Sequence, residues 1–358
     1  MSPCYNTHMT KSMKKVMIAV LCAAGAIIVL VGAFFVTAIV GFGGRYTDAD
    51  GRWRRATWKS SVSWTMEHPA FDGYGKYLLP WREGSASSAV PWMSYFWMCA
   101  TTGWNTDDVV DGVNFMMARE EEDGVRFIAF YDDGEISDSP DKADTGLIYI
   151  PGDGSKPFAF VVPGGGFTSE AVTAEGFTAA RELHERGYPV FILIYRVSIE
   201  NAWSEQEALA NADFGAAMRY IFGNASDLGV RTDGYSVWGY SAGGRLSWLW
   251  GLDNEFGYEE HGVTAPTAVI LSYSGWHEER FADDYGGVPP TFFGYCENDK
   301  VIGEEKSKGI ERYIEELRLL GTYVEAHVYD APHGYGTGAG TEAYGWMESA
   351  YAFWEKHM

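Results

Sequence analysis

From about residue 125 to the C-terminus, short apolar runs alternate with stretches of helical periodicity, and this alternation constrains the fold more than any other feature. Eight runs are expected to be strands: 125–131, 147–150, 158–162, 190–195, 235–238, 268–272, 291–295 and 323–329. Helices are expected at 170–186, 204–222, 304–320 and 341–356. This order predicts an α/β fold with a mostly parallel central sheet and helices on both of its faces.

The chemistry of such a sheet is found at the carboxyl ends of its strands. The strand expected at 235–238 runs into Gly239-Tyr240-Ser241-Ala242-Gly243, which has the GxSxG pattern of a nucleophile elbow. In an elbow the chain turns sharply from strand to helix, so the serine hydroxyl is exposed, and glycines on either side leave room for the turn. Ser241 is therefore the candidate nucleophile, and the backbone N–H of Ala242 is a candidate oxyanion donor.

Three consecutive glycines follow the strand expected at 158–162, in the loop Pro163-Gly164-Gly165-Gly166-Phe167. Without side chains, the backbone N–H groups of such a run can approach a developing oxyanion. A phosphate-binding loop is the alternative, but it would carry a lysine followed by serine or threonine directly after the glycines, and this loop does not. The N–H groups of Gly165 and Gly166 are therefore candidate oxyanion donors.

Two later loops supply the acid and the base that a serine nucleophile needs. Asp299 lies just past the strand expected at 291–295, where it could orient an imidazole and stabilise its charged form. Many carboxylates are present in the chain, and Glu297 and Asp330 are the alternative acids. The placement at the end of a strand favours Asp299.

The candidate base is His333, in the loop after the last expected strand. Only three of the eight histidines follow Asp299, as the chain order Ser, Asp, His requires. His327 falls inside an expected strand, and His357 is at the end of the chain. His333 lies between a proline and a glycine in a loop, which suits a side chain that must reach a serine.

These four loops resemble those of the α/β-hydrolase superfamily, from about residue 146 to the C-terminus. The resemblance is to its esterase and lipase branch, which includes carbohydrate acetyl esterases and hormone-sensitive-lipase-like enzymes. The residues that carry it are the glycine run with Phe167, the elbow at 239–244, Asp299 and the pair His333-Gly334. Pro163 is a departure, because many lipase-like members have histidine before the glycines.

The resemblance implies a serine carboxylic-ester hydrolase with a Ser-Asp-His triad and no cofactor or metal. It favours the removal of short acyl groups, acetyl first, from carbohydrate or other small esters. Phe167 and Tyr240 are candidate substrate contacts. The alternatives are a serine peptidase or lipase of the same fold and, in another class, a non-catalytic membrane-anchored binding module.

The N-terminal part begins with a short basic tail, residues 1–15, and an apolar segment, residues 16–42. This segment exceeds the roughly 20 residues that a helix needs to cross a bilayer. A secretory signal peptide has an apolar stretch of only about 7 to 15 residues. We therefore expect an uncleaved transmembrane anchor, with a cleaved signal peptide as the alternative, and in both cases an extracytoplasmic catalytic domain.

Residues 45–120 hold seven of the fourteen tryptophans and show no clean periodicity. A solvated linker would not carry so many indole rings, so we expect an extension or lid that packs its rings against the catalytic domain at 121–358. Extra packing and an active-site cover are both compatible with the sequence.

Composition excludes one class of partner. The chain has 49 acidic and 27 basic side chains, a formal net charge of -22. Nucleic acid binding requires clustered lysine and arginine to replace counterions, and this balance argues against it. Outside the N-terminal segment only Cys99 and Cys296 remain, without metal-ligand spacing. Two isolated thiols are expected, with a single disulfide as the alternative.

Overall fold

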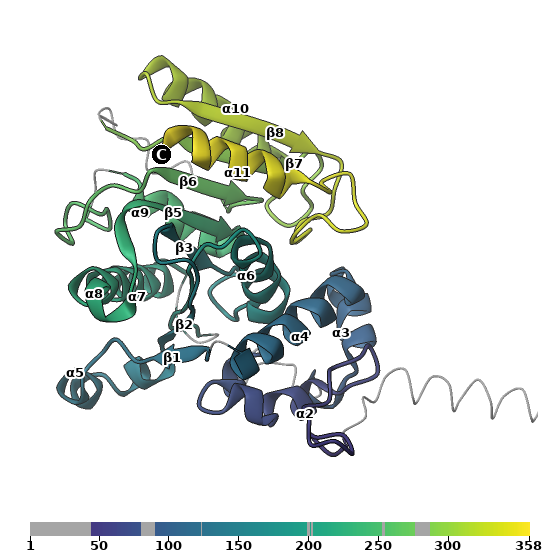
Figure 1. Ribbon diagram of the computed structural model, residues 1–358. Helices are drawn as coiled ribbons and strands as arrows, with labels where there is room; N and C mark the ends of the chain where they lie inside the picture. The colour runs from purple at the N-terminus through teal and green to yellow at the C-terminus, as the bar shows by residue number, and fades with distance from the viewer. Residues whose placement is uncertain are drawn as a thin grey trace, which may run out of the picture.

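The computed structural model describes residues 44–79, 90–122, 124–198, 201, 203–252, 255–275 and 287–358 (Figure 1). The basic tail at 1–15 and the anchor expected at 16–42 lie outside these residues. None of the helices in the described ranges combines the length and apolarity that crossing a bilayer requires.

The centre of the molecule is an eight-stranded sheet in the order β1-β2-β4-β3-β5-β6-β7-β8. Its strands are β1 Arg126–Ile128, β2 Gly146–Ile150, β3 Pro157–Val162, β4 Val190–Ile194, β5 Arg231–Tyr240, β6 Ala268–Ser272, β7 Thr291–Cys296 and β8 Val324–Tyr329. β2 is antiparallel to both β1 and β4, and all other pairs are parallel. The mostly parallel sheet predicted from the sequence is confirmed.

Strand β3 shows why both faces of the sheet must be covered. Phe158, Phe160 and Val162 pack into one apolar cluster, whereas Ala159 and Val161 pack into another on the opposite face. All five side chains are fully buried. Because side chains alternate along a strand, a run that is apolar at every position requires a layer of helices on each face.

The helices form those two layers (Figure 1). One face packs against α6 Phe177–His184 and α11 Trp346–His357, and the other against α7 Trp203–Gly223, α9 Ser241–Trp250 and α10 Glu304–Leu319. The short helices α5 Asp133–Asp138 and α8 Ala225–Leu228 lie in the connections after β1 and α7. The helices expected at 204–222 and 304–320 match α7 and α10.

Two expected helices begin later than predicted. Instead of a continuous helix from 170, the chain forms a π-helical turn at Val172–Gly176, and α6 starts only at Phe177. The C-terminal helix starts at Trp346 and not near 341, because Gly338, Gly340 and Gly345 all have positive φ angles. A left-handed residue ends a run of helical backbone, so this stretch forms turns.

The region before β1 is mostly short helices: α2 Val62–Met66, α3 Tyr95–Thr102 and α4 Thr106–Glu122, with single 3-10 turns at Pro69–Phe71, Gly75–Tyr77 and Val90–Trp92. We call residues 44–122 the extension. In Figure 1 its helices gather beside α6, on one side of the sheet. The expectation that its tryptophans are buried holds for Trp64 but is wrong for Trp58 and Trp92, which are 41% and 67% exposed.

Helix α4 packs the extension against α6, and the sequence interpretation missed it. Val109, Val113 and Met116 are buried on one face of it. Gly112 packs so closely on α6 that a Cβ there would lie 3.2 Å from the backbone nitrogen of Thr178. These three apolar residues are separated by four and then three positions, a spacing that is typical of one face of a helix and could be read from the sequence.

Candidate active site

Ser241 stands at the junction between β5 and α9, in the backbone conformation of a sharp elbow. Its φ angle is +48°, which an L-residue rarely adopts. A Cβ on Gly239 would lie 2.3 Å from Ser247 Oγ, and a Cβ on Gly243 would lie 2.0 Å from the carbonyl oxygen of Val162. Both glycines of the GxSxG pattern are therefore required by close packing around the turn.

The structure brings Ser241, His333 and Asp299 into one hydrogen-bonded chain. Ser241 Oγ is 2.9 Å from His333 Nε2, and His333 Nδ1 is 2.7 Å from Asp299 Oδ2. The three residues come from the ends of β5, β8 and β7, respectively. This arrangement matches the order nucleophile, base and orienting acid.

Asp299 is held so that one of its oxygens faces the imidazole. Its other oxygen accepts hydrogen bonds from the backbone N–H groups of Val301 and Ile302, at 2.9 and 3.0 Å. Burial opposes its ionisation, but the hydrogen bonds and charge of His333 and these N–H donors bring the pKa of Asp299 below its usual value. The alternative acids Glu297 and Asp330 are exposed.

The glycine run lies opposite the elbow. A Cβ on Gly164 would be 2.7 Å from Ser241 Cβ. Gly165 and Gly166 have φ angles of +136° and +64°, and both line the same cavity as Ala242, Ser241 and His333. The candidate oxyanion donors are therefore gathered around the serine hydroxyl.

A residue that sequence interpretation missed, Glu175, lies beneath this loop. It is buried in the π-helical turn, where one carboxylate oxygen accepts the N–H of Gly164 at 2.6 Å. The other accepts the hydroxyl of Tyr273 at 3.0 Å. Tyr273 Oη in turn accepts the N–H of Gly336 at 3.3 Å, three residues after His333. Glu175 thus ties the glycine loop to the histidine loop.

Burial gives Glu175 an unusual ionisation. Desolvation raises its pKa to about 6, although the hydrogen bonds from Gly164 and Tyr273 and the charge of His333 act in the opposite direction. The ring of Tyr273 also lies edge-on to His333, with 5.1 Å between ring centroids. Glu175 fell inside an expected helix, and in the structure it faces the glycine loop from a π-helical turn, so no sequence pattern singled it out.

The cavity over Ser241 has a volume of about 660 Å³. Its walls come from several parts of the chain: Thr101, Thr102, Trp104, Gly165, Gly166, Thr168, Ser169, Ala171, Glu175, Trp203, Ser241, Ala242, Gly275, Val301, Ile302, His333 and Gly334. The candidate substrate contacts Phe167 and Tyr240 are not among them. Both side chains are buried behind the wall, and Phe167 packs against Trp203 with 4.8 Å between ring centroids.

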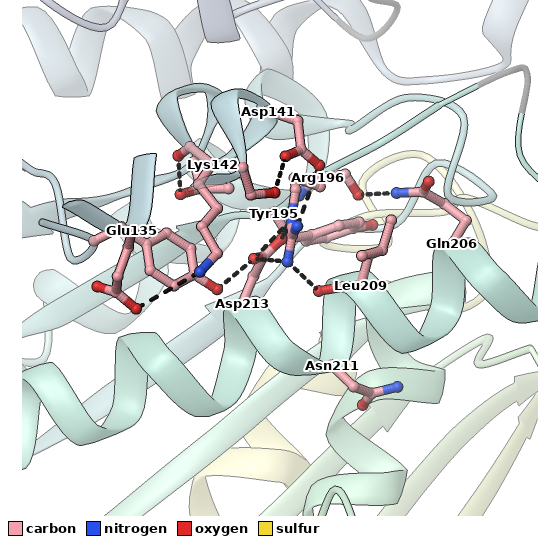
Figure 2. Close-up of polar contacts among 12 residues, drawn as sticks. Glu135, Asp141, Lys142, Tyr195, Arg196, Gln206, Leu209, Asn211 and Asp213 are labelled. Atoms are coloured by element: carbon pink, nitrogen blue, oxygen red, sulfur yellow. Dashed lines mark hydrogen bonds and ion pairs between the residues drawn. The ribbon is translucent and has the colours of Figure 1, made fainter. Parts of the chain in front are cut away.

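A buried ion pair joins the end of β4 to α7, the helix that begins at the cavity residue Trp203 (Figure 2). Arg196 follows β4, and its guanidinium lies 2.8 Å from Asp213 Oδ1 of α7. The hydroxyl of Tyr131 also donates to Asp213, at 2.7 Å, and Gln206 donates to the carbonyl of Arg196. Removing one partner of such a pair leaves a buried charge, which costs about 3 to 5 kcal/mol. The end of β4 is thus firmly joined to α7.

Within the described ranges, no group of three or more histidine, cysteine, aspartate or glutamate side chains could hold a metal ion. Cys99 and Cys296 are buried free thiols, so the single-disulfide alternative is wrong. Burial raises the pKa of each thiol to about 12.

Sequence comparison finds similarity to a carboxylic ester hydrolase over part of the chain. Residues 147–270, from β2 to β6 and including the elbow, match the protein family BD-FAE. The chain is also 30% identical over 186 residues to the probable carboxylic ester hydrolase LipM of Mycobacterium tuberculosis. That alignment covers 51% of this chain and 41% of LipM, so it spans less than half of the relative.

Solved structures agree in fold. The thermophilic esterase Est2 of the planctomycete Thermogutta terrifontis matches with a TM-score of 0.53 and 22% identity, over 65% of this chain and 92% of that chain. The acetyl ester-xyloside bifunctional hydrolase of Caldicellulosiruptor lactoaceticus matches with a TM-score of 0.52 and 20% identity, over 64% and 96%. The chain therefore shares the fold of these esterases, the α/β-hydrolase fold that the resemblance implied, and part of its sequence is similar to a carboxylic ester hydrolase.

Proposed function

We propose that this protein is a serine carboxylic ester hydrolase in which Ser241, His333 and Asp299 form the catalytic triad. The observation that carries the proposal is the hydrogen-bonded chain from Ser241 Oγ through the imidazole to Asp299. It stands at the floor of a cavity that also holds Gly165, Gly166 and Ala242.

The proposed reaction has two steps. His333 Nε2 takes the proton of Ser241 while Oγ attacks the ester carbonyl, and the N–H groups of Gly165, Gly166 and Ala242 stabilise the oxyanion. The imidazolium then gives its proton to the leaving alcohol, which leaves an acyl-serine. Water, deprotonated by His333, attacks this acyl group and releases the acid, and the proton returns to Ser241. Asp299 holds the imidazole tautomer and offsets its positive charge throughout.

Short acyl groups, acetyl first, are the proposed substrates, carried on carbohydrate or small alcohols. Support comes from the structural neighbours: one structure of the Thermogutta terrifontis esterase has propionate bound, and another neighbour is an acetyl ester-xyloside hydrolase. A cavity of about 660 Å³ is large enough for a small ester with a ring-sized alcohol.

Replacing Ser241 with alanine tests the proposal. Activity on a short acyl ester should fall by roughly a thousandfold or more, because the triad acts as a unit. The variant should also lose labelling by a fluorophosphonate probe, while circular dichroism shows the same fold. Asp299→Asn is the second variant, and it should lower kcat by a similar factor through the wrong imidazole tautomer. Unchanged turnover in Ser241→Ala would overturn the assignment.

We also propose that residues 16–42 anchor the protein in a membrane, with the catalytic part on the extracytoplasmic side. The support is the apolar length of the segment, which exceeds the roughly 20 residues of a spanning helix. The full chain should then stay in the membrane fraction after alkaline carbonate washing and be cut by protease added to intact cells. Release by carbonate would contradict the anchor.

A further inference from the structure

One wall of the cavity comes from the extension. Thr101, Thr102 and Trp104 lie where α3 ends and α4 begins, and all three line the cavity with Ser241 and His333. We call residues 101–105 the α3–α4 corner. The structural neighbours align with about 65% of this chain while almost their whole length is matched, so they have no counterpart for much of the remaining third.

The corner is attached to the loop that carries His333. A Cβ on Gly334 would lie 3.4 Å from Trp104 Nε1, so the indole lies against the residue that follows His333. Asn105 Nδ2 donates to the carbonyl of Ala339 at 3.4 Å. The indole of Trp104 is half-buried and packs on the main apolar cluster. Its position relative to His333 is therefore set by the fold.

This position decides which part of the substrate meets Trp104. In the proposed reaction the ester oxygen of the alcohol must come within hydrogen-bond distance of His333 Nε2, because that nitrogen protonates it. The carbonyl oxygen must instead point at Gly165, Gly166 and Ala242. Trp104 is next to the histidine, so it borders the alcohol part of the ester.

The chemistry of the corner suits a particular alcohol. An indole offers a flat apolar surface with an N–H at its edge. The hydroxyls of Thr101 and Thr102 donate to the carbonyl of Met98 at 2.8 and 2.9 Å. With their protons used in this way, these oxygens can only accept further hydrogen bonds, and the hydroxyl groups of an alcohol substrate can donate them. A flat apolar face beside two acceptors matches a sugar ring, which has C–H faces and hydroxyl edges.

We propose that Trp104 is a specificity-determining residue that binds the carbohydrate alcohol of the ester, with Thr101 and Thr102 accepting hydrogen bonds from its hydroxyls. The inference rests on the proposed esterase function and names the substrate side of the same site. It assigns the extension a direct part in substrate selection.

The test compares two acetyl esters of different alcohols, a methyl pyranoside that carries one acetyl group and ethyl acetate. In Trp104→Ala, kcat/KM for the sugar ester should fall about tenfold or more, mainly through KM, because a binding surface is lost while the triad is intact. For ethyl acetate, whose ethyl group has neither a ring face nor hydroxyls for the corner to bind, kcat/KM should fall by a clearly smaller factor than for the sugar ester. Trp104→Phe keeps an aromatic face and should retain most activity on the sugar ester.

Trp92→Ala is the matched control, because Trp92 belongs to the same extension but is 67% exposed and outside the cavity lining. It should leave both esters unchanged. Equal losses on both esters in Trp104→Ala, or no loss on either, would overturn the specificity role. A wild-type enzyme that hydrolyses ethyl acetate but not the sugar ester would also overturn it while the esterase function stands. Absence of wild-type turnover on both would remove the proposed function itself.

Discussion

The region from β1 to the C-terminus and the extension at 44–122 meet at one cavity, but they are held together by different means. In the first region, eight hydrogen-bonded strands place Ser241, Asp299 and His333 at the ends of β5, β7 and β8. The described residues of the extension contribute no strand to that sheet. The sheet region therefore positions the proposed triad, while the extension supplies part of the cavity wall around it.

The extension is organised around a ring cluster. His68 is buried, and the rings of Tyr46, Trp53, Trp64 and Phe71 surround it with 5.2 to 6.3 Å between centroids. Burial lowers the pKa of His68, so its neutral form packs in this cluster. Ring packing of this kind leaves no simple periodicity in the sequence. It can nevertheless carry a surface loop such as the α3–α4 corner to a defined place.

Substitutions in each region, ranked by the loss of activity that we expect, test this difference between the regions. The largest effect is expected at Ser241, where the loss should be roughly a thousandfold or more. Substitutions that weaken the support for the triad should lower kcat less. Substitutions that weaken the attachment of the extension should lower it least.

Glu175→Gln tests the support inside the sheet region. A glutamine cannot accept hydrogen bonds from both Gly164 and Tyr273 at once, because one of its two terminal atoms is a donor. The hydroxyl of Tyr273 already accepts the N–H of Gly336, so the hydrogen bond between residue 175 and Tyr273 would be weakened. We expect kcat to fall roughly 10- to 100-fold, with a smaller change in KM, because the oxyanion loop loses its alignment.

The same substitution, which should lower kcat, should raise the stability of the protein relative to wild type as the pH rises. The pKa of Glu175 is raised to about 6 in the folded protein from an ordinary 4.5, so between these values the folded state binds more protons than the unfolded state. The free energy of unfolding therefore falls as pH rises through this window, by about 2 kcal/mol in total. Glutamine does not titrate. The free energy of unfolding of Glu175→Gln, relative to that of wild type, should therefore rise by about this amount between pH 4.5 and 7.

Urea unfolding at the two pH values measures this difference, and steady-state kinetics on ethyl acetate measure kcat. Tyr273→Phe serves as the control, because it removes one of the two hydrogen bonds to Glu175 and leaves the charge in place. It should lower kcat without removing the pH dependence of stability. A Glu175→Gln variant with wild-type kcat would show that the carboxylate is only a packing element.

Asp108→Asn tests the attachment of the extension. Asp108, on α4, accepts the hydroxyl of Thr337 at 2.6 Å and the guanidinium of Arg181 at 2.9 Å, and Thr337 lies in the loop that follows His333. An amide retains only one acceptor, so the loop should be held less tightly. We expect kcat on ethyl acetate to fall roughly three- to tenfold with little change in KM.

Thr337→Val should have a similar effect, and the two changes together should give less than the product of their separate factors, because they remove the same contact. Asp107→Asn is the matched control, since Asp107 is the exposed neighbour in the same first turn of α4. If Asp107→Asn and Asp108→Asn lowered kcat by the same factor, the loss would come from the charge at the helix start and not from the contact with Thr337.

The sequence predicted the sheet region well because its signals are local. Each strand is a short apolar run, and each candidate in the triad follows one, so Ser241, Asp299 and His333 could be proposed without knowing any distance. The order β1-β2-β4-β3 and the antiparallel placement of β2 could not be predicted, because strand order depends on which buried faces meet in three dimensions. The role of Glu175 could not be predicted for a related reason, because its partners Gly164 and Tyr273 are distant from it in sequence.

The extension was predicted less well. Its tryptophans suggested burial, but only the fold decides which ring is covered, and Trp92 is exposed while Trp104 lines the cavity. Helix α4 had a readable apolar face at Val109, Val113 and Met116, which the clustering of tryptophans obscured.

The π-helical turn at Val172–Gly176 also sets the rotational phase of the helix that follows it. An α-helix advances by about 100° per residue, so one additional residue in a turn rotates all later side chains by roughly that angle. Glu175 can therefore face Gly164, while Phe177 and Leu183 of α6 still face the apolar cluster. The single extra residue lets one segment serve both the reaction and the core.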